Sequence, residues 1–185
     1  MQELVIDTLK DTYNAEKQIL KALPKMEKAA THPKLKEMFR KHLVQTEDHV
    51  KRLEEAAKML KTKPTGKVCK GMQGLIEEGE EAIKEFAGNE VGDAALIVAA
   101  QKVEHYEIGA YGTIITWCEQ MGLQEVANAL KPTLNDEETT DKMLTDVAEG
   151  EINRKAIAMP APEKAKAPAK KSTSNSTPRG KVSVR

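Results

Sequence analysis

The sequence predicts an all-α protein whose core is a four-helix bundle. Of its 185 residues, 39% are hydrophobic, which is enough to fill the core of one domain, but only 3% are aromatic. Ala, Leu, Lys and Glu dominate, and these residues favour helices over a sheet core rich in Val, Ile and Tyr. Four long segments carry apolar residues at spacings of three and four, which is the period of an amphipathic helix.

The first two helices are predicted over residues 3–30 and 34–61. Each carries an apolar stripe along one face. Pro24 predicts a bend in the first helix, because proline cannot donate the backbone hydrogen bond of a helix interior. The second helix begins after the Thr-His-Pro turn at residues 31–33. Because so few residues connect the two helices, we expect them to form an antiparallel hairpin.

The other two long helices are predicted over residues 90–121 and 123–156, with a stop near Gly122, and form a second hairpin. About 28 residues separate the two hairpins, which is long enough to cross the bundle. This crossover contains the pattern of a short fifth helix around residues 74–86. One long crossover between two helical hairpins is the arrangement of ferritin-like bundles.

The C-terminal segment differs in composition from the rest of the chain. Residues 158–185 contain seven Lys or Arg and one Glu, a net charge of +6, which leaves −6 for residues 1–157. Large apolar residues are nearly absent from this segment, so burial cannot offset the entropy cost of ordering it. The sequence therefore predicts a helical domain over residues 1–157 and a disordered basic tail over residues 158–185.

The chain also lacks the marks of export and of membrane insertion. No segment approaches the roughly 18 consecutive apolar residues of a membrane-spanning helix. The first ten residues, MQELVIDTLK, do not show the basic and then apolar order of a signal peptide. Cys69 and Cys118 are too few and too isolated for a disulfide framework. We expect a cytoplasmic protein with two free thiols and no membrane contact.

Polar residues interrupt the apolar stripe of every long helix near its middle. An ionised carboxylate in an apolar bundle costs several kcal/mol unless it is paired, protonated or bound to a cation. Any one such acid is usually explained by an edge position or a Lys partner, but four helices that meet at mid-length favour a shared metal site. The candidate ligands on the stripes are Glu16, His49, Glu104, Glu107, Glu137 and Asp141, with His42 and Gln45 on the same face as His49.

Three segments resemble a known family. DTYNAEKQILKAL at 11–23, KHLVQT at 41–46 and NEVGDAALIVAAQKVEHYEIGAYGT at 89–113 are similar to the YciF-like branch of the ferritin-like superfamily, a group of small bacterial stress-associated proteins. The resemblance spans residues 3–157. It implies a ferritin-like bundle, a homodimer and a carboxylate site for two metal ions, in a superfamily whose members handle ferrous iron, dioxygen or peroxide. The family's central acids correspond to Glu16, Glu104, Glu107 and Glu137.

The second helix departs from the family pattern. Where family members read H-L-E-E-T, this chain has His42-Leu43-Val44-Gln45-Thr46, so the resemblance predicts a missing carboxylate there. His49, one turn from Gln45, is the expected substitute. The set of oxygen ligands with one or two imidazoles favours two iron or manganese ions. The missing carboxylate predicts either a single metal position or two unequal positions, one held more loosely than the other. Tyr13, His42, Gln45 and Tyr111 are expected around the ligands.

Three functions are compatible with the sequence. The first is a stress protein with a two-metal site that acts as an oxidase or peroxidase. The second is a non-catalytic bundle whose inward acids are protonated or salt-bridged. The third is a stress-protective bundle that contacts DNA through the phosphates with its basic tail, without base specificity and with strong salt dependence.

Overall fold

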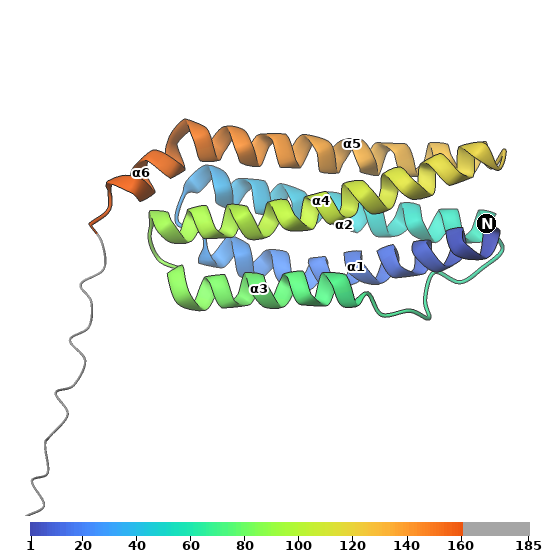
Figure 1. The fold of residues 1–185 in the computed structure, drawn as a ribbon, viewed down its shortest axis with the longest axis horizontal. Helices are drawn as coiled ribbons and strands as arrows, with labels where there is room; N and C mark the ends of the chain where they lie inside the picture. Colours follow the sequence, from blue (N-terminus) through green and yellow to red (C-terminus); the bar gives the residue numbers. More distant parts are fainter. Residues whose placement is uncertain (161–185) are drawn as a thin grey trace, which may run out of the picture.

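The computed structural model describes residues 1–160, and the predicted tail therefore lies almost entirely outside the described residues. The described part contains helices and no strands, which confirms the all-α prediction (Figure 1). The helices are α1 (Gln2–Ala29), α2 (Pro33–Met59), α3 (Lys70–Phe86), α4 (Glu90–Gln120), α5 (Gln124–Val147), the π-helical turn η1 (Ala148–Ile152) and α6 (Asn153–Ala158).

The connectivity is the predicted one. Helices α1 and α2 form one hairpin and α4 and α5 form the other (Figure 1). The crossover runs back along the bundle as α3, which lies on the outside against α1 and α4. Helix α4 consequently runs parallel to α2, as a ferritin-like bundle requires.

Two helix boundaries differ from the prediction. Helix α3 begins at Lys70, earlier than expected, because Cys69 caps it: its Sγ accepts a hydrogen bond from the Met72 backbone N–H at 3.4 Å. The last predicted helix is divided, since the π-helical turn interrupts it after Val147. Helix α1 continues through Pro24 without a break. Cys69 and Cys118 are both free and buried, and no helix among the described residues is long and apolar enough to cross a membrane.

The apolar core is split into two clusters along the bundle. One cluster contains Leu9, Leu53 and Leu130, and the other contains Ile19 and Leu144. On α2, α4 and α5 the predicted polar residues lie in sequence between the buried members of the two clusters. On α1, Glu16 lies next to Ala15, where one cluster ends and the other begins. The burial pattern therefore leaves a polar layer across the middle of an otherwise apolar bundle. The polar or charged side chains buried in this layer include Glu16, His42, Thr46, His49, Glu104, Glu107, Thr133, Glu137 and Thr140.

A buried carboxylate outside this layer joins the two hairpins. Asp93, in the first turn of α4, is 1% exposed. Its Oδ1 accepts a hydrogen bond from the Thr31 backbone N–H at 2.7 Å, and its Oδ2 accepts one from the His32 backbone N–H at 2.9 Å. The Thr31 hydroxyl also donates to Oδ2, at 2.5 Å. Asp93 thereby fixes the turn that leads into α2.

Replacing Asp93 by Ala should lower the free energy of unfolding by about 2–4 kcal/mol, because the three donors of partly buried hydrogen bonds lose their acceptor. Urea unfolding followed by circular dichroism measures the change. Asp146→Ala, an exposed position on α5, is the matched control and should change stability by less than about 0.5 kcal/mol. Equal stability of the two variants would show that the turn does not depend on Asp93.

Candidate metal centre

The polar layer contains two groups of ligand-type side chains. In each group the nitrogen and carboxylate oxygen atoms offered by the side chains all lie within 4.8 Å of one another. Every member is buried, and Glu137 belongs to both groups. The first group is His42, Glu104, Glu107 and Glu137, and the second is Glu16, His49 and Glu137. The structure thus brings together five of the six predicted ligands. The first group also includes His42, which was predicted to lie beside the ligands and not to be one of them.

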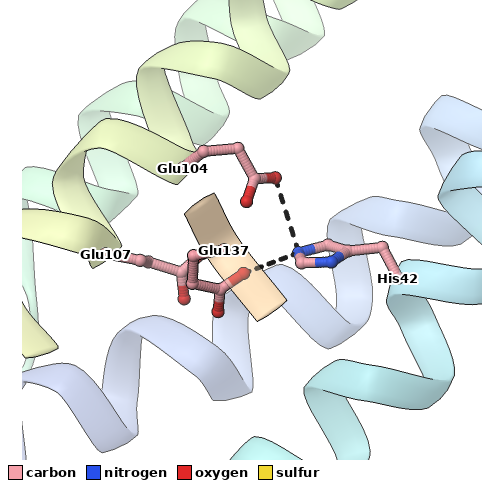
Figure 2. A group of neighbouring side chains, drawn as sticks. All are labelled: His42, Glu104, Glu107 and Glu137. Atoms are coloured by element: carbon pink, nitrogen blue, oxygen red, sulfur yellow. Dashed lines mark ion pairs between the residues drawn. The ribbon is translucent and has the colours of Figure 1, made fainter. Parts of the chain in front are cut away.

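The first group is arranged around the imidazole of His42. Its Nε2 lies 3.5 Å from Glu104 Oε1 and 3.6 Å from Glu137 Oε2. Figure 2 shows these two contacts converging on one nitrogen, with Glu104 and Glu107 reaching in from α4 and His42 from α2. Glu104 and Glu107 share this face because three residues make nearly one helical turn.

The second group is arranged around His49. Its Nδ1 lies 2.9 Å from Glu137 Oε1 and 3.4 Å from Glu16 Oε1. The hydroxyl of Tyr111 donates a hydrogen bond to the same Glu16 oxygen at 2.5 Å. Tyr111 therefore lies directly behind a candidate ligand.

Each histidine has a polar contact on its second ring nitrogen. His49 Nε2 lies 3.3 Å from Asp136 Oδ2, which also accepts a hydrogen bond from Arg52 Nη1 at 3.0 Å. The Nδ1 atom of His42 lies 3.4 Å from the Thr140 hydroxyl. Contacts of this kind fix the orientation of a ligating imidazole and leave its other nitrogen available to a metal.

Sequence reasoning missed these supporting residues. Asp136 and Arg52 are half-buried, so they do not stand out on an apolar stripe. Only their places in the sequence could have identified these two residues. Asp136 directly precedes Glu137, and Arg52 lies three residues after His49.

Burial and mutual repulsion raise the pKa of two acids far above the usual range. For Glu104 the main cause is desolvation, followed by the charge of Glu137. For Glu107 desolvation again comes first, followed by the charge of Glu16. Desolvation likewise raises the pKa of Tyr111 and strengthens its role as a donor to Glu16. Without a cation, burial and the neighbouring charges therefore favour the protonated forms of Glu104 and Glu107.

The two histidines differ in charge. Desolvation lowers the pKa of His42, so its ring is neutral. Desolvation opposes the charge on His49 too, but the carboxylates of Glu137 and Glu16 beside its Nδ1 outweigh it and raise the pKa of His49 to about 10. In the metal-free protein, an imidazolium and carboxyl protons thus take the place of cations. Metal binding must displace those protons.

Besides Tyr111, three predicted residues lie outside the two groups. Asp141, one turn beyond Glu137, accepts a hydrogen bond from Gln101 at 3.1 Å and lies 3.2 Å from the exposed His105. This placement does not support its prediction as a ligand. Tyr13 donates to Glu54 at 3.0 Å, outside both groups. Gln45 is half-buried and contacts His42, but it belongs to neither group.

Position 44, one of the two departures on the second helix, lies away from the polar layer. Val44 is 58% exposed, so an acid at this position would also lie at the surface and not in the polar layer. The contribution of α2 to the layer comes instead from His42 and His49, both almost fully buried. Helical periodicity explains this, because seven residues make two turns and return to the same face.

Comparisons with known proteins agree with the fold and the resemblance. The family described as "Domain of unknown function (DUF892)" matches residues 1–157. Protein YciF of Escherichia coli K12 is 46% identical over 159 residues, which cover 84% of this chain and 95% of that protein. The crystal structure of the E. coli stress protein YciF superposes with a TM-score of 0.79 at 45% identity, covering 83% of this chain and 97% of that one.

A second solved structure is similar to the same degree. YcfI of Rhodopseudomonas palustris, which carries a provisional description as a structural protein, is 42% identical with a TM-score of 0.77. The match covers 80% of this chain and 95% of that one. The chain described here therefore belongs to the DUF892 family, as a YciF-like protein with a ferritin-like helical bundle.

Proposed function

We propose that the polar layer holds two iron or manganese ions and that the protein uses them in a stress response, as an oxidase or peroxidase. Iron bound here would supply electrons for the reduction of dioxygen or peroxide. The E. coli relative is described as a stress protein, which supports the physiological setting.

The observation that carries the proposal is the set of buried polar atoms without partners. Nine buried side-chain nitrogen or oxygen atoms of the described residues lack a partner with hydrogen-bond geometry. Eight of them belong to the six side chains of the two groups, and both oxygens of Glu107 are among them. Native proteins satisfy nearly all such atoms, and the binding of an ion is a recognised reason for a cluster of exceptions.

The ligand types indicate which metals fit. Four carboxylates and two imidazoles form a site rich in hard oxygen donors, which suits iron or manganese. Both buried cysteines lie outside the two groups, so the thiolates of a structural zinc site are missing there. Glu137, shared by the two groups, would help to hold both ions.

The two groups are unequal, which supports the expected asymmetry. The first offers three carboxylates and one imidazole, whereas the second offers two carboxylates and one imidazole. The position at Glu16 and His49 should therefore hold its ion more loosely. The supporting contacts keep the neutral His42 oriented by Thr140 and hold His49 against Asp136.

Protein purified without chelator from iron- and manganese-replete cells should contain roughly one to two ions per chain. Titration of the chelator-treated protein with Mn²⁺ should resolve one tight and one weaker position. The loaded protein should consume dioxygen or peroxide when ferrous iron is supplied. Metal-free protein whose thermal midpoint does not change when either ion is added would instead support the non-catalytic bundle.

We also propose that the basic tail contacts DNA, because residues 158–185 carry a net charge of +6. Such binding would go through phosphates, and its affinity should fall steeply as salt rises. Deleting residues 158–185 should abolish a low-salt gel shift of duplex DNA and leave the metal content unchanged. A shift that persists after the deletion would assign DNA binding to the bundle.

A further inference from the structure

An apolar pocket leads from the surface to the first group of ligands. It lies where α3 covers α1 and α4, the arrangement seen along the lower side of the bundle in Figure 1. Its lining includes the Lys25–Glu80 ion pair, at 2.6 Å and partly exposed, and also the buried His42 and Glu104. One pocket thus extends from a solvent-exposed ion pair to two side chains of the candidate metal centre.

Small residues create this space. Gly79 of α3 and Ala22, Ala99 and Ala100 of α1 and α4 all line the pocket. A Cβ atom added to Gly79 would lie 3.6 Å from the Cβ of Ala99. The absence of side-chain volume at Gly79 therefore keeps this part of the pocket open. Larger residues would fill it with their own side chains.

The walls between the two ends are hydrophobic. They are formed by residues such as Ile19, Leu75, Ile76 and Val103. Apolar cavities in proteins stay dry, because a water molecule needs two to four polar partners. A hydrated cation would lose its shell along these walls without gaining ligands. The lining therefore favours a neutral, apolar occupant.

The volume of the pocket limits the size of the molecule that could bind in it. Its volume is about 40 Å³, whereas one water needs about 10–15 Å³ by the same kind of measure. The space suits a molecule of two or three atoms and is too small for a fatty acid or an aromatic ring. A diatomic gas matches both the volume and the apolar lining.

We propose that this pocket binds dioxygen, as a small neutral apolar molecule, and brings it to the metal centre from the side of His42 and Glu104. The inference rests on the proposed function, since it assigns the oxidant to the two-metal site. It also implies that dioxygen and the metal ions reach the centre by different paths, because an apolar pocket does not suit a hydrated cation. Helix α3 belongs to the crossover and lies outside the bundle, where it covers this pocket.

Xenon tests the pocket without any metal, because it is a small apolar atom that occupies dry cavities. Crystals of the chelator-treated protein under xenon pressure should show one xenon site between α3 and α4. Gly79→Ala should reduce its occupancy severalfold, because the new methyl group enters a space of about 40 Å³. Gly74→Ala is the matched control, on the same helix but with nothing within 4 Å of the added atom.

Rates on the metal-loaded protein test delivery to the centre. Under limiting dioxygen, Gly79→Ala should slow dioxygen consumption severalfold while metal content stays unchanged, and Gly74→Ala should not slow it. Ala22→Leu fills the pocket from the opposite wall, on α1, and should act in the same direction even if α3 shifts in the first variant.

Each outcome decides a different question. The absence of xenon from the unmodified protein would overturn the assignment of the pocket. Xenon binding with unchanged dioxygen rates in both filled variants would overturn delivery through the pocket. Native protein that retains no metal would refute the proposed function, and the xenon result would still report on the pocket itself.

Discussion

Glu137→Gln should remove metal from both positions at once. Glu137 is the one residue that belongs to both groups of ligand atoms, with Oε1 2.9 Å from His49 and Oε2 3.6 Å from His42. Gln keeps the volume but lacks the charge that a bridging carboxylate shares between two cations. Loss of an outer-shell partner typically lowers metal affinity about 10- to 100-fold, and loss of a shared ligand should cost more. Elemental analysis of purified protein measures the effect.

Asp141→Asn is the matched control for this variant. Asp141 lies on the same helix one turn further on, and its contacts are with Gln101 and His105, outside both groups. Its replacement should leave the metal content unchanged. If the two variants retained equal amounts of metal, the ions would not bind where the two groups meet.

The sequence predicted the bundle because helical periodicity and connection length are local properties. Spacings of three and four identify the helices, and a crossover of about 28 residues requires the second hairpin to pack beside the first. The π-helical turn after Val147 and the cap at Cys69 have no comparable signal. The link between Thr31 and Asp93 spans 62 positions, so no local pattern contains it.

The site was predictable to the extent that it depends on helix faces. Glu16, Glu104, Glu107 and Glu137 interrupt apolar stripes, and all four are almost fully buried. Periodicity gives the face of a residue but not its depth or its direction along the helix axis. It therefore could not separate Glu137 from Asp141, one turn apart on α5.

The raised pKa of Glu107 shows why the site lowers the stability of the metal-free protein. Desolvation raises the pKa of Glu107 well above its usual range, and neither carboxyl oxygen has a hydrogen-bond partner. A raised pKa in the folded state means that the folded protein is more stable at low pH, where Glu107 is protonated in both states, than at high pH. The extra stability at low pH is lost as the pH rises through the raised pKa, because Glu107 ionises more readily in the unfolded chain.

Glu107→Leu should therefore stabilise the metal-free protein while it weakens metal binding. Replacing an unpartnered buried polar group by a hydrophobic one of similar volume should raise the free energy of unfolding by about 1–3 kcal/mol. The gain should be larger at mildly alkaline than at mildly acidic pH, because only the unmodified protein loses stability as the pH rises. Urea unfolding in the presence of a chelator measures both effects.

Glu107→Gln is the control that separates charge from polarity. It removes the titration but keeps two buried polar atoms, so its stability should be independent of pH and lower than that of Glu107→Leu. With Mn²⁺ in place of chelator the order should reverse, since the unmodified protein alone keeps all four ligands of the first group. If Glu107→Leu were instead the least stable protein with chelator, Glu107 would stabilise the bundle by itself, and its burial would need no cation.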